Sequence, residues 1–446
     1  MTSTLTAHIV DPYLPETPIA NVIRDVITGN ERAGRLEEAF YVVDVENIIE
    51  KYRKLLKYMP RMKQHYAIKG NPSPIVLEIL AGMGISFDCA SRGEIETILK
   101  LGVSPNRIIF ANPVKARSHI TFAAEVGVTK MTFDSEYELY KIQRMYPGAD
   151  MVLRILVSDK SVKYPLAKKL GVNIIGTSFH VGSLCQSGKA YARAIRDSRY
   201  VFDLGNELGF NMHLLDIGGG FSGTTTSLNK TSIDMAQTVS KALEYYFPVF
   251  NQTTDFTVIS EFGRYYVDTA YTLADVIEGK KRVILDDVKS NIRNEMMYYI
   301  MDGVHQSFRE VLVKNDFHDP IPLDPHNPNE PLYNTTLWGP TCDSVDAVRK
   351  GFWLPELSIG EWIYFDTMGA YTVAEGGEFN GFKVPRQLFF VSERARQTIN
   401  AMNNRDMIFA ILATGAIPTE ELVDVDLHQS RTPFASCSLP LQFPFI

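Results

Sequence analysis

The sequence predicts an α/β part, a (β/α)8 barrel, followed by an all-β part of sandwich or barrel-like form. Two observations carry this prediction. Eight short apolar runs alternate with helix-like stretches between residues 64 and 261, which is typical of parallel strands joined by crossover helices. Beyond residue 261 the chain changes to short strand-like runs separated by loops rich in Pro and Asn, such as residues 321–331, which is an all-β pattern.

The eight runs of the first part are short, and several are continuously apolar, as expected for strands that are covered on both faces. Repeated over about 200 residues, their alternation with helices favours a TIM-type barrel. The expected strands are residues 64–69, 85–89, 107–111, 129–133, 151–157, 174–181, 213–217 and 256–261. The expected helices include residues 73–83, 91–101, 115–126, 135–146, 189–208 and 233–246.

Local signals mark several helix starts. Ser91 and Glu94 have the spacing of a capping box, and Asp134 and Ser232 are expected to be N-caps. The unit between the fifth and sixth strands offers only residues 158–173, with a turn or two of helix at 165–170. Because a crossover usually takes a dozen or more residues and a full helix, this barrel unit is predicted to be shortened.

The second part of the chain has its own set of strands. They are expected at residues 269–276, 282–285, 296–301, 335–338, 362–365 and 387–391, with residues 39–43 recruited from the N-terminal arm. We therefore divide the chain into an arm (1–43), a barrel (44–267), a β domain (268–412) and a C-terminal tail (413–446). From about residue 420 the tail is rich in Ser, Pro and Phe, and it is expected to be poorly ordered.

Composition limits the possible functions. The chain has 446 residues, of which 45% are hydrophobic and 22% charged, and its formal net charge is −7. The acidic balance and the lack of a basic stripe argue against nucleic-acid binding. No apolar run approaches the roughly 18 residues that span a bilayer, and residues 1–6 do not resemble a signal peptide. Four cysteines in so long a chain make no disulfide framework, so a cytoplasmic location is expected.

Polar and glycine-rich groups stand at the carboxyl ends of the predicted strands, where a (β/α)8 barrel carries its chemistry. Lys69 closes the first strand, and the Gly, Asn and Pro residues behind it end that strand. An amine held there can form a Schiff base with an aldehyde, usually pyridoxal 5'-phosphate (PLP). The other strand ends supply Asp88, Arg154, His180, Ser183, Gly218, Gly219, Gly220, Glu261, Phe262, Gly263 and Arg264.

These groups suit the parts of PLP. The three glycines let backbone N–H groups approach a phosphate, to which Ser183 can add a hydroxyl and Arg264 a charge. Glu261 can keep the ring nitrogen protonated, so that the ring withdraws electrons. His180 can stack on the ring, while Asp88 and Arg154 orient neighbours and balance charge. Each residue alone has an ordinary explanation, such as a solvated charge, a tight turn or a core histidine; the joint pattern favours a cofactor site.

The β domain adds further candidates. Cys342 and Asp343 lie on a Gly-Pro turn that can face a cleft, although such a cysteine is equally well explained as a small buried hydrophobe. The phenol of Tyr371 can reach a phosphate. Phe379 can give aromatic cover to the site.

Seven segments together resemble the eukaryotic ornithine decarboxylase family: residues 66–69 (YAIK), 87–91 (FDCAS), 180–183 (HVGS), 216–221 (DIGGGF), 261–266 (EFGRYY), 338–343 (WGPTCD) and 369–372 (GAYT). The resemblance extends from about residue 38 to residue 391. It implies a PLP-dependent amino-acid decarboxylase with the alanine-racemase-like fold, a barrel plus a β domain. It also implies an obligate head-to-tail homodimer, in which Cys342 and Asp343 of the partner subunit complete each site.

The resemblance assigns a role to each matching position. Lys69 would carry the cofactor as the internal aldimine, His180 would lie against the ring, and Glu261 would meet the pyridine nitrogen. Cys342 would return a proton to the substrate carbon after CO2 leaves, and Asp343 would accept the distal ammonium of a diamino acid. The phosphate would be held by Ser183, Gly220, Gly263, Arg264 and Tyr371.

The chain departs from the family pattern in four places. The family has Pro where this chain has Phe262, and Gly where it has Leu184. The shortened fifth unit is the third departure. In the fourth, Val313 and Lys314 replace the tyrosine and aspartate beside the distal amine, where a lysine would repel an ammonium by roughly 4 kcal/mol at 4 Å. Asp316, two residues further on and on the same side of an extended strand, could substitute for the lost aspartate if the local register shifts.

Three functions remain open from the sequence. The first is decarboxylation of a basic amino acid, with L-ornithine giving putrescine in polyamine biosynthesis. The second is decarboxylation of another amino acid, because Lys314 replaces the usual aspartate. The third is a catalytically inactive protein that binds antizyme, as the family's antizyme inhibitors do. Retention of Lys69, Asp88, Arg154 and Glu261 favours an enzyme.

Overall fold

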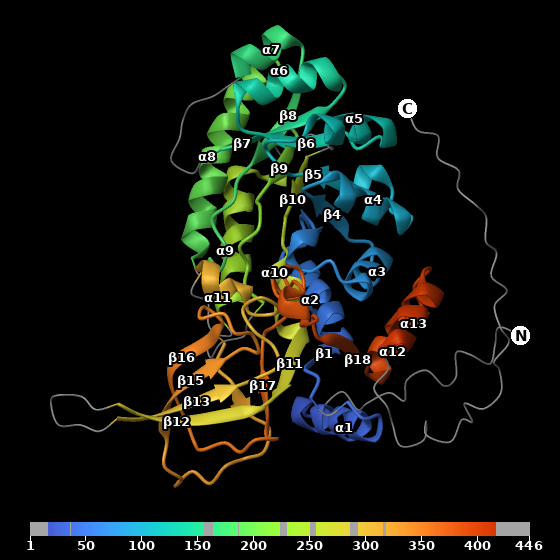
Figure 1. The fold of residues 1–446 in the computed structure, drawn as a ribbon. Helices are drawn as coiled ribbons and strands as arrows, with labels where there is room; N and C mark the ends of the chain where they lie inside the picture. The colour runs from blue at the N-terminus through green and yellow to red at the C-terminus, as the bar shows by residue number, and fades with distance from the viewer. Residues whose placement is uncertain are drawn as a thin grey trace, which may run out of the picture.

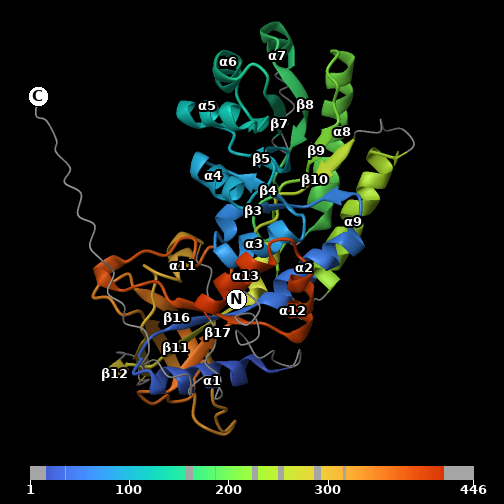
Figure 2. The ribbon, with the colours of Figure 1, turned by 90° about the vertical axis from the view of Figure 1, so that its right-hand side faces the viewer.

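The computed structural model describes residues 17–35, 37–155, 164–185, 187–223, 230–249, 256–285, 293–314 and 318–415. A parallel barrel makes up one end of the molecule and two β-sheets the other (Figures 1 and 2). The segment beyond residue 420, which the sequence predicts to be poorly ordered, lies outside the described residues.

The barrel strands follow one another around a closed sheet, all parallel, in the order β2-β10-β9-β8-β7-β6-β5-β4-β3. β2 and β3 are two halves of one strand separated by Gln64, and a bridge between Tyr66 and Phe262 joins β3 to the end of β10. The predicted (β/α)8 barrel is therefore confirmed. The strands are β2 (Met62–Lys63), β3 (His65–Ala67), β4 (Ser86–Cys89), β5 (Ile108–Phe110), β6 (Lys130–Phe133), β7 (Asp150–Arg154), β8 (Asn173–Ser178), β9 (Leu214–Asp216) and β10 (Thr257–Ile259).

Helices cover the outside of the barrel, with α3 to α5 on one side, α8 and α9 on the other, and α6 and α7 at the far end (Figure 1). Two of the expected N-caps are wrong. Ser135, not Asp134, caps α6 and accepts a hydrogen bond from the Glu138 N–H, and Ser232 lies inside α9. The helices are α2 (Val45–Tyr58), α3 (Pro74–Gly82), α4 (Arg92–Lys100), α5 (Arg117–Val126), α6 (Glu136–Met145), α7 (Tyr164–Leu170), α8 (Gly188–Glu207), α9 (Lys230–Tyr246) and α10 (Arg264–Val267).

The predicted shortening of the fifth unit is confirmed. The crossover from β7 to β8 contains α7, a helix of seven residues. The two strands nevertheless pair in parallel from Asp150–Asn173 to Arg154–Ser178, with one register shift after Met151. The short connection therefore leaves the barrel sheet continuous.

Two further sheets form the other end of the molecule, in the orders β14-β17-β11-β1-β18 and β12-β13-β15-β16. Short β14 and the longer β16 were not anticipated from the sequence. The polar Arg349, Lys350 and Gly351 interrupt the apolar pattern of β16, which pairs with β15 through two irregularities. The strands are β1 (Phe40–Asp44), β11 (Tyr271–Val276), β12 (Gly279–Leu285), β13 (Arg293–Tyr299), β14 (Ile321–Pro322), β15 (Tyr333–Trp338), β16 (Ala347–Leu354), β17 (Trp362–Phe365) and β18 (Arg386–Phe390).

Four helices accompany these sheets. α1 (Ile19–Arg32) buries Val22, Ile23 and Val26 against the face of the five-stranded sheet that carries Phe40 and Val42. α11 (Arg309–Lys314) precedes β14. α12 (Glu393–Asn400) and α13 (Arg405–Thr414) return the chain to the barrel, where Asn404 donates hydrogen bonds to Glu78 of α3. In the described part of the chain, no helix has the length and apolar composition needed to cross a membrane.

Candidate active site

The sequence predicts that Lys69 ends a strand, and this prediction is wrong by two residues. The strand ends at Ala67, and Lys69 lies in the 3-10 turn η2 (Ile68–Gly70) that follows. The turn is pressed against the loop after β10, because a Cβ on Gly70 would lie 3.3 Å from the Gly263 Cα. The turn presents the lysine side chain, which is half exposed, beyond the carboxyl end of β3.

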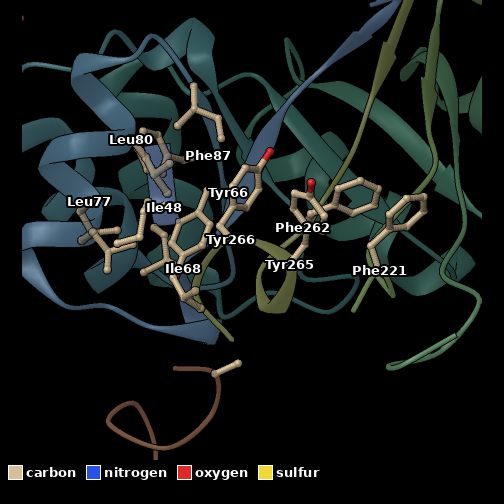
Figure 3. Close-up of a cluster of buried hydrophobic side chains, with 14 of the residues drawn as sticks. Ile48, Tyr66, Ile68, Leu77, Leu80, Phe87, Phe221, Phe262, Tyr265 and Tyr266 are labelled. Carbon is tan, nitrogen blue, oxygen red and sulfur yellow. The ribbon is translucent and has the colours of Figure 1, made fainter. Parts of the chain in front are cut away.

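Buried aromatic rings hold this turn in place (Figure 3). Tyr66 packs edge-on against Tyr266, with ring centroids 5.8 Å apart, and its hydroxyl donates a 2.8 Å hydrogen bond to the Asn71 carbonyl. Phe262 stacks on Phe221 at 4.4 Å. The Phe262 side chain is therefore part of the core, and only its backbone is left to contribute to a site.

Asp88, near the end of β4, faces Lys69. Its Oδ2 lies 3.5 Å from the Lys69 Nζ, and its side chain is 2% exposed. The carboxylate raises the pKa of Lys69 above its usual range, and Glu261 adds to the effect. Burial raises the pKa of Asp88, whereas Lys69 and Arg154, the last residue of β7, act to lower it. Asp88 therefore balances two cations at the mouth.

The helix start next to this pair matches the sequence prediction closely. Ser91 caps α4 and accepts from the Glu94 N–H at 3.2 Å. The Glu94 carboxylate accepts in return from the Ala90 N–H at 2.5 Å, one residue before the expected position. Glu94 is thereby fixed close enough to Lys69 to raise its pKa further.

Two buried carboxylates stand behind the lysine. Burial raises the pKa of Glu261 well above its usual range, and the charges of Asp216 and Asp88 raise it further. The pKa of Asp216 is raised to about 6, again chiefly by burial. Three acidic groups thus share one small region. A cation placed among them, such as a protonated ring nitrogen, would relieve their mutual repulsion.

His180, two residues beyond β8, is a neutral imidazole at physiological pH. Burial lowers its pKa to about 4, and the charges of Lys69 and Arg154 act in the same direction. Its Nδ1 accepts a 2.9 Å hydrogen bond from the Gly182 N–H. An uncharged ring in a fixed orientation is suited to lie against the face of a flat cofactor.

The glycines after β9 form a cradle that side chains would fill. A Cβ on Gly219 would lie 2.9 Å from the Glu261 carbonyl oxygen and 3.0 Å from the His180 Nε2. Gly218 and Gly220 have φ of +64° and +112°, in the region that favours glycine. Backbone N–H groups in such a loop are accessible to a phosphate. Ser183, exposed in the adjoining turn, lies next to this loop, because the Cys185 N–H bonds to the Gly220 carbonyl at 2.9 Å.

The side chain of Arg264 is already paired. Its guanidinium donates to both carboxylate oxygens of Glu310, at 2.9 and 2.8 Å, lies 3.5 Å from Asp268, and stacks 5.0 Å from the ring centre of Tyr371. Tyr371 has φ of +59° and donates its N–H to the Gly70 carbonyl. Gly263, Arg264 and Tyr371 therefore lie beside the lysine turn, and Arg264 also ties the barrel to α11.

Cys342 and Asp343 belong to a second group, in the β domain. Cys342 is exposed, and the Asn380 Nδ2 lies 3.8 Å from its sulfur. The Asp343 Oδ2 lies 3.0 Å from the His305 Nε2, and Phe379 covers the His305 ring at 4.2 Å. Within the described residues, no hydrogen bond or ion pair joins Cys342 or Asp343 to Lys69, His180 or Glu261. The described contacts thus give two groups of candidate residues, one around Lys69 and one around Cys342 and Asp343.

Val313 and Lys314 were expected on an extended strand, and this prediction is wrong. They are the last two residues of α11, and Val313 is 68% exposed. The suggestion that Asp316 could substitute for the lost aspartate stays a prediction, because Asp316 lies outside the described residues.

Four residues of this region were not predicted from the sequence to belong to the site. Asp216 was noted only as the start of the glycine segment, and Glu310, His305 and Asn380 were not selected at all. His305 follows the Asp-Gly-Val segment at 302–304, and its partner Asp343 is distant in the chain. No local sequence pattern indicates such a pair.

The site fits PLP: an amine on a rigid turn, a buried acid for a ring nitrogen, a neutral histidine and a glycine cradle for phosphate converge at one barrel mouth. The family model described as "Pyridoxal-dependent decarboxylase, pyridoxal binding domain" matches residues 45–166 and 161–268. The chain belongs to this family of pyridoxal-dependent decarboxylases. Its cofactor is pyridoxal 5'-phosphate.

Similar proteins agree with this assignment. Rat ornithine decarboxylase is 41% identical over 411 residues, which cover 87% of each chain. Antizyme inhibitor 2 of Xenopus laevis is 42% identical over 395 residues, covering 84% of this chain and 85% of that protein. The crystal structure of arginine decarboxylase from Paramecium bursaria Chlorella virus has a TM-score of 0.75 and 30% identity, and covers 83% of this chain and all of the other. The chain is therefore a relative of the decarboxylases of basic amino acids.

Proposed function

We propose that the protein is a decarboxylase of a basic amino acid, with L-ornithine as the first candidate substrate and putrescine as the product. The observation that carries the proposal is the pairing of Lys69 with buried Asp88 at 3.5 Å, at the mouth that also holds Glu261 and His180. A decarboxylase needs all of these groups, whereas a protein that only binds a partner needs none of them.

The cofactor, when bound, accepts the electrons of the bond that releases CO2. The residues of this chain position it and set its charge. Lys69 offers the amine that holds it, and Asp88 orients that amine. Glu261 is suited to keep a proton on the ring nitrogen, because a cation there offsets the repulsion among three acids. His180 would lie against one face of the ring.

The group of residues around Cys342 and Asp343 leads us to propose a homodimer. Cys342 is exposed on its turn and not joined to the Lys69 group of its own chain, so a neighbouring copy is the natural recipient of its thiol. There Cys342 would return a proton to the substrate carbon, and Asp343 would accept the distal ammonium. Oligomers of identical chains are commonly two-fold symmetric, so each subunit would both give and receive this group.

A direct test measures PLP content and CO2 release from carboxyl-labelled ornithine, lysine and arginine. We expect stoichiometric PLP and release of CO2 from at least one of them. Lys69→Ala should abolish the absorbance of the bound cofactor, whereas Lys63→Ala, at an exposed position on β2, should leave it unchanged. Unaltered absorbance in Lys69→Ala would remove the basis of the proposal.

A substrate other than ornithine is favoured by one feature. Val313 and Lys314 end α11 where the family pattern has tyrosine and aspartate, so position 314 offers no negative charge for the distal amine. The similarity to an arginine decarboxylase makes arginine a reasonable member of the panel. The ratio of kcat/KM values across the panel identifies the preferred side chain.

Antizyme binding is a second candidate function, because an antizyme inhibitor is among the similar proteins. We propose that the protein acts in the cytoplasm. Co-purification with antizyme tests antizyme binding independently of catalysis. Antizyme binding together with absence of PLP and of CO2 release would favour the inhibitor function over the enzyme.

A further inference from the structure

Asp343, the acid proposed to receive the distal ammonium, already has partners. Its Oδ1 accepts from the Val345 N–H at 3.1 Å, and its Oδ2 lies 3.0 Å from the His305 Nε2. The side chain of Asp343 remains 32% exposed, so an incoming ammonium can still approach it. The ammonium and the His305 imidazole would then share the Asp343 carboxylate.

The imidazole is held in this position from two sides. The Phe379 ring lies against it with a centroid distance of 4.2 Å and a tilt of 30°. The loop that carries Phe379 is anchored at its start, because the Gly377 N–H donates to the His305 carbonyl at 3.0 Å. The next residue of the loop, Asn380, contacts the Cys342 sulfur and has φ of +54°. One loop therefore fixes both the thiol and the histidine–aspartate pair.

We propose that His305 determines how strongly the distal part of the substrate site binds a positive charge, by controlling the net charge of the His305–Asp343 pair. This inference rests on the proposed function, since it takes Asp343 to be the receptor of the distal ammonium. Neutral His305 donates its Nε2–H and orients the carboxylate, leaving the pair with a charge of −1. Protonated His305 makes the pair neutral, and an ammonium then gains no net attraction.

The sign of the effect follows from this charge. Histidine is the side chain that ordinarily changes charge between pH 5 and 8. As the pH falls, binding of a distal ammonium should weaken, whereas binding of a ligand without that ammonium should not respond to His305. Asp343 faces the imidazole at 3.0 Å, and the Phe379 ring lies against it. Other ionisable groups are close in the chain: Cys342 and Asp346 lie on the same turn as Asp343, Glu378 precedes Phe379, and Asp302 lies three residues before His305. Asp346 is buried and already bonded to the Val304 N–H.

The test compares two probes on the PLP-loaded protein: 1,4-diaminobutane and 1-aminobutane. Both amines stay protonated below pH 9, since alkyl ammonium groups titrate near 10.4. The ratio of their dissociation constants isolates the distal ammonium and cancels titration at the cofactor end. Calorimetry from pH 5.5 to 8 should show the preference for the diamine rising on the order of tenfold in the unmodified protein.

Two variants separate the roles of charge and shape. His305→Gln keeps an amide donor without a titrating ring, and His305→Phe keeps a ring against Phe379 without a donor. In both, the preference for the diamine should be constant within about twofold over the same pH range. Urea denaturation confirms that each variant is folded.

The outcomes distinguish this inference from the proposed function. A flat ratio in the unmodified protein, or the same pH dependence in His305→Gln, overturns the role of His305 even if CO2 is released. A diamine that binds no better than the monoamine at any pH overturns it as well. A pH-dependent ratio that both variants abolish supports it, even if the protein releases CO2 from no amino acid of the panel.

Discussion

Backbone strain lies close to the functional groups of this protein. Among the described residues other than glycine, positive φ occurs at Leu184, Thr367, Tyr371 and Asn380. Leu184 follows Ser183, Tyr371 bonds to the Lys69 turn, and Asn380 contacts Cys342. A left-handed conformation costs a residue with a side chain roughly 1–2 kcal/mol. Three of these strained residues therefore border groups assigned to the cofactor or the substrate, where strain commonly persists.

Leu184 allows a test of this strain. Its φ is +55°, so the glycine of the family pattern suits the turn better than leucine does. Leu184→Gly should raise the free energy of unfolding in urea by up to about 1 kcal/mol. The matched control is Leu208→Gly, at the C-cap of α8 with φ of −81°, which should lower it by a similar amount. A loss of stability at both positions would show that the turn stores no strain.

At the residue scale, the sequence predicted the groups that stand next to strand ends. Lys69, Asp88, His180 and Glu261 were predicted because parallel strands bring their carboxyl ends together. The structure places Asp88, Glu261 and His180 within electrostatic range of Lys69. The contact of His305 with Asp343 was not predicted, because the fold of the β domain, not a local pattern, brings the two residues together.

The glycine loop after β9 gives a prediction at the scale of an element. Gly219 has no unusual φ, so alanine is allowed by its backbone and excluded by space, with contacts of 2.9 and 3.0 Å to Glu261 and His180. Gly219→Ala should displace both groups and weaken PLP binding by tenfold or more, about 1.4 kcal/mol, while the protein stays folded. Gly148→Ala, where a Cβ meets only Tyr146 at 3.9 Å, should change nothing. Equal PLP affinity in both variants, measured by fluorescence titration, would contradict the cradle.

Elements with a strong periodic pattern were predicted well, and elements set by tertiary contacts were not. The barrel strands and most of its helices agree with the structure to within a few residues. α11 was taken for an extended segment, although its Glu310 is drawn into a buried ion pair with Arg264 that stabilises a helix at this place. α1 was not predicted because its apolar stripe is short and packs against the five-stranded sheet, most of whose strands come from later parts of the chain.

The whole molecule carries a pH dependence that arises at the site. The pKa of Asp216 rises from 3.8 to about 6 in the folded protein, so the folded state holds its proton more tightly than the unfolded state. Its stabilising contribution is therefore complete below pH 3.8 and is lost as the pH rises through about 6. Asp216→Asn keeps an acceptor for the Gly218 N–H and does not titrate.

The cofactor-free protein tests this linkage. The free energy of unfolding of Asp216→Asn minus that of the unmodified protein should increase as the pH rises from 4 to 6.5. Glu261 should add to this increase. Without the Asp216 charge the pKa of Glu261 is raised less, so the variant loses less stability than the unmodified protein when Glu261 ionises. Urea denaturation at several pH values measures the difference. A difference that stays constant, or that falls with pH, would mean that the buried acids do not destabilise the empty site.

Assembly gives the last prediction at this scale. If Cys342 serves the Lys69 of a neighbouring copy, Lys69→Ala and Cys342→Ala are each inactive alone, yet a mixed dimer of the two contains one site with both native groups. Equal amounts that exchange subunits freely form mixed dimers half of the time, so about a quarter of the native sites should work. If both groups act within one chain, every site in the mixture lacks one of them. CO2 release that recovers on mixing therefore supports the shared site, and a mixture as inactive as its components excludes it.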